Sequence, residues 1–91
     1  MADVIVTLKI MPESPEVNLK AIQISADSAI KAFGGEVGKV ETEPIAFGLK
    51  ALKIIFVMDE AKGATDPLEE KISALAGVNS VEVTDIRRAI G

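Results

Sequence analysis

The chain has 91 residues, of which 48% are hydrophobic and 26% charged, and its formal net charge is −4 at pH 7. These values are typical of a small globular protein, so we expect residues 1–91 to form a single domain with one core. The lack of cysteine excludes disulfides and thiolate zinc sites, and the lack of histidine excludes imidazole ligands and His-dependent triads. We therefore predict no catalytic, cofactor-binding or metal-binding residues.

Composition also restricts the partners. The chain is acidic, it has no Tyr or Trp, and it has only three Phe residues that could stack on a base. It is therefore a poor ligand for the phosphate backbone of a nucleic acid. There is no run of about 18 apolar residues, and the amino terminus carries Asp3 where a secretory signal carries Lys or Arg. We expect a cytoplasmic protein that binds neither nucleic acid nor a membrane directly.

The first third of the chain predicts a strand followed by a helix. Apolar and polar residues alternate over residues 3–11, which is the pattern of a half-buried strand that ends at Pro12. Over residues 19–33 the apolar positions recur every three or four residues, which indicates an amphipathic helix. Either Ser14 or Asn18 could cap its start, and Gly34-Gly35 ends it.

Two more strands are expected in the middle of the chain. Residues 36–43 form a short strand whose three glutamates suit a sheet edge, where charge discourages pairing with other molecules. A long third strand is predicted from about Phe47 to Met58, because residues 52–57 are apolar at nearly every position and suit an inner strand.

A second helix and a last strand complete the pattern. A capping box is predicted, with Asp66 as N-cap, Pro67 at the first helical position and Glu69 at the third. Gly77 suits the carboxyl end of this helix, which would have about three turns. Residues 78–86 alternate as a strand. The order β-α-β-β-α-β predicts an α+β fold, a ferredoxin-like sandwich with a four-stranded antiparallel sheet and two helices on one face.

Three places in the chain could make functional contacts. Phe47, next to Gly48, is either a core residue, which its pattern favours, or an exposed anchor for a partner. Lys50 and Lys53 are an odd number of positions apart, so they should point to opposite sheet faces, as solubilising charges or as contacts to an acidic partner. Arg87 and Arg88 follow the last strand as a mobile basic tail that could reach an anion site.

Three segments resemble the translation elongation factor 1-beta family, and they are similar to its archaeal form. They are Met11-Pro12-Glu13 with the flanking strand and helix, the run Pro44-Ile45-Ala46-Phe47-Gly48-Leu49, and the region from Thr65 to Arg88. The resemblance implies that the partner is the GTPase elongation factor 1-alpha. It also implies that the activity is release of GDP so that GTP can bind, without any bond being made or broken.

The resemblance also implies which residues bind the partner. Phe47 and Gly48 match an aromatic-glycine corner of the family, and Lys50 matches the first basic residue after it. Eukaryotic members insert a lysine near the C-terminus beside the magnesium and phosphate site of the GTPase, and here Arg88 takes that position, with Arg87 before it. Thr42 replaces an aromatic residue of the family, so that contact is not carried over.

One alternative belongs to a different functional class. The ferredoxin-like architecture hosts many unrelated functions, among them small-ligand-binding regulatory modules such as amino-acid sensing domains. Such a module would ignore a nucleotide-free GTPase, whereas an exchange factor would accelerate release of a labelled GDP. The sequence does not predict an oligomeric state.

Overall fold

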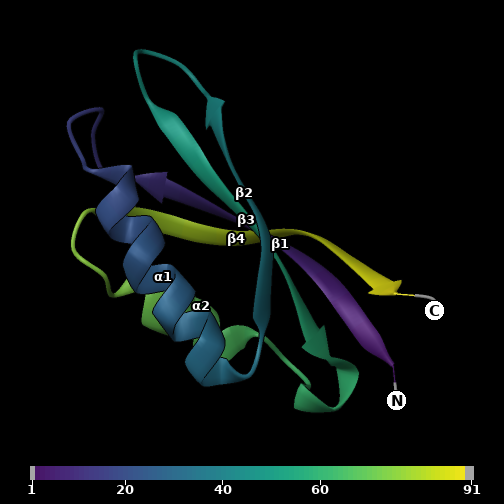
Figure 1. Ribbon diagram of the computed structural model, residues 1–91. Helices are drawn as coiled ribbons and strands as arrows, with labels where there is room; N and C mark the ends of the chain where they lie inside the picture. Colours follow the sequence, from purple (N-terminus) through teal and green to yellow (C-terminus); the bar gives the residue numbers. More distant parts are fainter. Residues whose placement is uncertain (1, 90–91) are drawn as a thin grey trace.

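The structure is a computed structural model that describes residues 2–89. Its elements follow the predicted order, with one additional turn of 3-10 helix after the third strand (Figure 1). They are β1 Asp3–Pro12, α1 Leu19–Phe33, β2 Glu36–Pro44, β3 Lys50–Asp59, η1 Glu60–Lys62, α2 Asp66–Ser73 and β4 Val78–Ala89.

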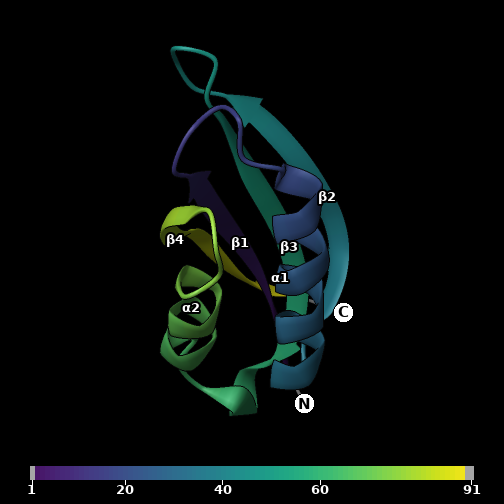
Figure 2. The ribbon, with the colours of Figure 1, turned by 90° about the vertical axis from the view of Figure 1, so that its left-hand side faces the viewer.

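The four strands form one antiparallel sheet in the order β2-β3-β1-β4. β1 pairs with both β3 and β4, and β2 pairs only with β3, so β2 and β4 are the two edges. Both helices cover the same face of this sheet, as Figure 2 shows, and within residues 2–89 no helix lies on the other face. This arrangement confirms the predicted ferredoxin-like α+β fold.

The core lies between the helices and the covered face of the sheet. From Val6 to Ile10 in β1 and from Leu52 to Met58 in β3, the alternate residues that face the helices are buried, because successive side chains of a strand point to opposite faces. The apolar stripes of α1 and α2 close the core from the other side. The largest fully buried side chains are Val6, Leu8, Ile10, Ile30, Leu52, Ile54, Phe56, Leu68 and Ile72.

The start of α1 resolves the alternative between two caps. Asn18 is the N-cap, and its side-chain oxygen accepts hydrogen bonds from the backbone N–H groups of Lys20 and Ala21 at 3.0 and 3.3 Å. Ser14 does not cap the helix. Gly34 ends it with a φ of 105°, in the left-handed region that glycine adopts without steric cost, which confirms the predicted C-cap.

Three element boundaries before β4 differ from the predictions. β3 begins at Lys50 instead of Phe47, because residues 45–49 form a turn. α2 has eight residues and ends before Leu75, and its N-cap is Thr65, not Asp66. The Thr65 hydroxyl donates to the Glu69 carboxylate at 2.8 Å, so the expected capping box does not form.

Candidate partner-binding site

Phe47 lies at the tip of the turn between β2 and β3. The Leu49 N–H donates to the Ala46 carbonyl at 2.9 Å, and the Ile45 N–H donates to the Leu49 carbonyl at 2.8 Å. The two central residues, Phe47 and Gly48, have φ values of 53° and 79°. Positive φ at both central residues is the requirement of a type I′ hairpin turn, which Asn-Gly usually satisfies and an aromatic residue rarely does.

This backbone conformation directs Phe47 into solvent. Its side chain is 97% exposed, so the interpretation of Phe47 as a core residue is wrong. The exposed aromatic gains nothing from burial within the chain, and it occupies a left-handed conformation that disfavours residues with a Cβ atom. An exposed aromatic held in this way has the properties of an anchor that becomes buried against another molecule.

The connection between β1 and α1 lies beside the turn. A Cβ atom built on Gly48 would lie 3.7 Å from Cβ of Pro15, in ordinary van der Waals contact. Lys50 lines the same cavity of about 170 Å³ as Gly48, together with Pro12, Ser14, Pro15, Val17 and Leu19. The three predicted residues Phe47, Gly48 and Lys50 therefore lie together at one end of the sheet, which we call the Phe47 end.

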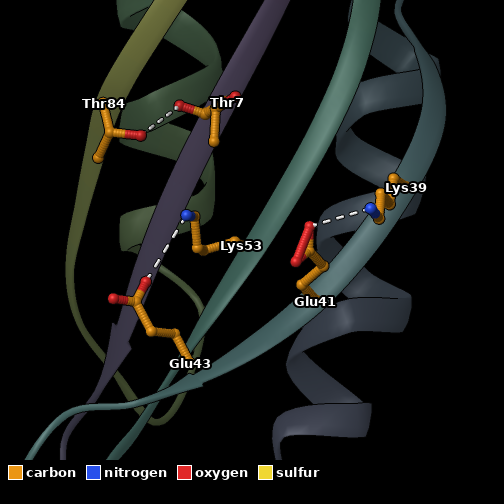
Figure 3. Close-up of polar contacts among 6 residues, drawn as sticks. All are labelled: Thr7, Lys39, Glu41, Glu43, Lys53 and Thr84. Carbon is orange, nitrogen blue, oxygen red and sulfur yellow. Dashed lines mark hydrogen bonds and ion pairs between the residues drawn. The ribbon is translucent and has the colours of Figure 1, made fainter.

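Lys50 and Lys53 point to opposite faces of β3, as their spacing predicted. Lys53 is half-buried on the uncovered face, where its Nζ lies 3.6 Å from a carboxylate oxygen of Glu43 on β2 (Figure 3). Lys50 is exposed and lies on the same side of β3 as the buried Leu52. Lys53 is thus already paired within the chain, whereas Lys50 lies at the Phe47 end.

Arg87 and Arg88 are not a tail, because β4 continues through both of them to Ala89. Their register partners are Ile5 and Val4 near the start of β1. Arg87 Nε donates to Asp85 Oδ2 at 2.9 Å, and Arg88 Nη2 donates to the carboxylate of Glu60 in η1. The two guanidinium groups remain more than two-thirds exposed and are held by local acids, so we call this region the arginine end.

The five predicted residues therefore form two groups at opposite ends of the sheet. Ile5, which is level with Arg87, lies seven residue steps along β1 from Pro12 beside Lys50, and this is about 23 Å of extended strand. The described part of the chain is 42 Å long in its longest dimension. A single partner that contacts both groups must extend along most of the molecule.

Sequence reasoning missed two features of the arginine end. Glu60, the partner of Arg88, lies in a 3-10 turn that no pattern predicted. Ile86 is 57% exposed and lines a cavity of about 330 Å³ between the sheet and the loop before α2. Within residues 2–89 no cluster of acidic residues could hold a metal ion, and no helix is long and apolar enough to cross a membrane.

Comparison with known proteins identifies the family. Residues 5–89 match the model of the EF-1 guanine nucleotide exchange domain. The chain belongs to the elongation factor 1-beta family. It is 50% identical to elongation factor 1-beta of Methanobrevibacter smithii and 47% identical to that of Methanothermobacter thermautotrophicus, in both cases over 97% of this chain and 98% of the relative. The predicted resemblance to the archaeal form is confirmed.

Solved structures share the fold at low sequence identity. The C-terminal domain of MgtC from Mycobacterium tuberculosis superposes with a TM-score of 0.61 at 15% identity, covering 98% of this chain and 88% of that one. The ACT domain of GTP pyrophosphokinase from Chlorobium tepidum gives 0.61 at 17% identity, covering 89% and 97%. These likenesses show the fold alone. The family match favours nucleotide exchange over a small-ligand-binding regulatory module.

Proposed function

We propose that this exchange domain promotes GDP release from elongation factor 1-alpha by binding the nucleotide-free GTPase more tightly than the GDP-bound form. Linkage requires that such a protein weakens GDP binding by the same factor, and each factor of ten corresponds to about 1.4 kcal/mol. No bond is made or broken, so the domain needs no catalytic group. Membership of the EF-1 guanine nucleotide exchange family supports this function.

The contact with the GTPase has two parts in this proposal. Phe47 is the anchor at one end, flanked by Gly48 and Lys50. The observation that carries the proposal is that this aromatic residue is exposed and held at positive φ. Arg87 and Arg88 supply positive charge at the other end. Since the two groups are about 23 Å apart along the sheet, they contact different regions of the GTPase.

The arginine end supplies the chemistry that would disturb bound nucleotide. A guanidinium brought close to the magnesium and phosphate site competes electrostatically with the cation and can bind phosphate oxygens through paired donors. Arg88 takes this role in the proposal, and it must first leave Glu60, while Arg87 leaves Asp85. Both ion pairs are largely exposed, so breaking them costs little.

The remaining expectations follow from this role. Residues 1–91 act as one exchange unit in the cytoplasm, where translation takes place. The acidic chain makes no direct contact with nucleic acid or with a membrane.

The test measures release of a fluorescently labelled GDP from elongation factor 1-alpha of the same organism. The native domain should accelerate release at substoichiometric amounts. A variant with both Arg87→Ala and Arg88→Ala should keep its fold and lose about tenfold or more of the acceleration, because charge-assisted contacts are removed. If the native domain leaves the release rate unchanged, the proposed function is wrong.

A matched variant controls for the change in net charge. Lys20→Ala with Lys31→Ala removes two exposed positive charges from α1, on the opposite side of the core from the uncovered sheet face. This variant should accelerate GDP release like the native domain. Equal losses in the two double variants would indicate a general charge effect and would argue against a specific role for the arginine end.

A further inference from the structure

The two edge strands of the sheet differ in charge. The edge strand β2 carries three glutamates and one lysine, Glu36, Glu41, Glu43 and Lys39, which gives a net charge of −2. A second copy of β2 would therefore be repelled, as the sequence predicted for this edge. β4 carries two acids and two arginines, Glu82, Asp85, Arg87 and Arg88, and its net charge is zero. Charge does not protect the β4 edge.

A β-bulge in β4 determines which of its residues share a face. Thr7 of β1 is paired with Asp85 and the next residue, Leu8, with Val83, so Thr84 is the extra residue of the bulge. Its hydroxyl donates to the Thr7 carbonyl at 3.4 Å (Figure 3).

The register assigns the flanking residues of β4 to the two faces. Val83 and Ile86 lie opposite the buried residues Leu8 and Val6, so they belong to the helix-covered face. Glu82 and Arg87 lie opposite Lys9 and Ile5, which point to the uncovered face. In a regular strand, residues an odd number of positions apart point to opposite faces. Because of the bulge, Val83 shares a face with Ile86, and Glu82 shares a face with Arg87.

We propose that β4 is a self-association surface, on which two copies of this chain pair antiparallel about a two-fold axis between Thr84 and Asp85. In this register Glu82 of each copy lies opposite Arg87 of the second copy, on the uncovered face. Val83 of each copy lies opposite Ile86 of the second copy, on the helix-covered face. The two-fold axis repeats each contact, so the pairing has two opposite-charge pairs and two apolar pairs.

Neighbouring registers lack this complementarity. A shift of one residue places Glu82 opposite Ile86 or Arg88 of the second copy, which belong to the other face of the sheet. A shift of two residues toward the start of β4 places Glu82 opposite Asp85, and two carboxylates then repel each other. The bulge and the charge order together disfavour these shifts.

The proposed surface gives a weak dimer. It buries Ile86, the exposed apolar residue of this edge, and it satisfies backbone donors and acceptors that β4 leaves unpaired. Pairing of one edge strand is a small interface, so we expect a dissociation constant of order 10 µM to 1 mM. Arg87 and Arg88 lie in this interface, so the dimer and the proposed GTPase complex exclude each other.

The first experiment reverses charges and measures mass by sedimentation velocity from about 10 µM to about 1 mM, which brackets the expected dissociation constant. The native chain should dimerise reversibly. Glu82→Arg alone and Arg87→Glu alone should each weaken dimerisation about tenfold or more, because like charges then face each other twice. The double variant should dimerise like the native chain, and an equimolar mixture of the two single variants should form a heterodimer.

The mixture also controls for folding. If the two single variants associate with each other, both chains are folded, and the weak association of each variant alone is due to the reversed charge. A native chain that stays monomeric at about 1 mM would refute the proposal. So would a native dimer that the single reversals leave unchanged, since another surface would then be responsible. The measurements use no GTPase, so either failure leaves the proposed exchange function standing.

A second experiment tests the register by disulfide trapping, which the lack of cysteine in the chain makes unambiguous. Asp85→Cys places two thiols next to the two-fold axis, at about 6 Å between Cα atoms, within the range of a disulfide. This variant should form a covalent dimer under mild oxidation. In this register a cysteine at position 79 lies eleven residue steps, about 36 Å, from the same cysteine of the second copy. The Asn79→Cys variant should therefore not form a covalent dimer. Equal trapping at both positions would refute the register.

Discussion

Phe47 is held in solvent by its own backbone. Its φ of 53° and that of Gly48, 79°, build the turn between β2 and β3, and the chain has no other described non-glycine residue at positive φ between residues 2 and 89. A fold that needed only a tight turn would be better served by asparagine at this position. The aromatic is therefore better explained by what it contacts outside the chain.

Phe47→Ala should reduce exchange without reducing stability. The side chain is 97% exposed, so the free energy of unfolding in urea should change by less than about 0.5 kcal/mol. Loss of an aromatic anchor should lower the acceleration of GDP release about fivefold or more. Phe56→Ala is the contrasting variant: Phe56 is fully buried, and its loss should cost about 3–5 kcal/mol. A destabilised Phe47→Ala domain with native exchange would show that the aromatic is structural.

The position of Phe47 could not be decided from the sequence. An aromatic residue beside glycine at the start of an apolar strand fits a buried residue as well as an exposed one. What decides is the sign of φ at two successive residues, which rotates the side chain away from the core. Lys50 and Lys53, by contrast, were placed on opposite faces from their spacing alone, because alternation along a regular strand leaves no choice.

At the level of elements, the helices depend on single polar residues at their starts. Asn18→Ala should lower the free energy of unfolding by about 1 kcal/mol, because two N–H groups at the start of α1 lose their acceptor. Ser14→Ala is the matched control, since Ser14 lies in the same connection and does not cap the helix. Urea unfolding of both variants distinguishes them. Equal losses would show that the cap contributes nothing specific.

Thr65 stabilises the start of α2 in a different way. Its buried hydroxyl donates to the half-buried Glu69 carboxylate, so Thr65→Val should cost about 1–2 kcal/mol although it keeps the side chain's shape. Asp66→Asn changes an exposed residue that makes no cap bond, and its effect should stay within about 0.5 kcal/mol. Thermal unfolding of the two variants measures both losses of stability. A larger loss for Asp66→Asn than for Thr65→Val would contradict this role of Thr65 and would support the capping box that the sequence predicted.

The element order was predictable, whereas the extent of β4 was not. Periodic patterns of two and of three to four residues identified β1, β4 and both helices, because each buries one face. The inner strand β3 was identified by a nearly continuous apolar run instead. In β4 the extra residue Thr84 interrupts the alternation, so Arg87 and Arg88 fall out of period and resemble a tail. The bulge depends on pairing with β1, which lies far away in the sequence, so no local pattern could have indicated it.

At the level of the whole molecule, the predicted partner-binding residues lie at two distant ends. Changes at the two ends should therefore act independently. When Phe47→Ala is combined with Arg87→Ala, their effects on the activation free energy of GDP release should add within about 0.5 kcal/mol, because sites separated by more than about 10 Å rarely couple. The release rates of the native domain, the two single variants and the double variant together give this double-mutant cycle. A combined effect no larger than either alone would indicate one shared contact.

The sheet is longer than the helices that cover it. The strands have up to 12 residues, about 40 Å, whereas α1 and α2 span only about 22 and 12 Å. At the arginine end, the start of β1 and the end of β4 extend past both helices (Figure 1). Backbone amides there are backed by fewer buried side chains, so deuterium uptake should be faster there than beside α1. The molecule thus combines a rigid, helix-backed half with a compliant half that can twist to follow the surface it meets.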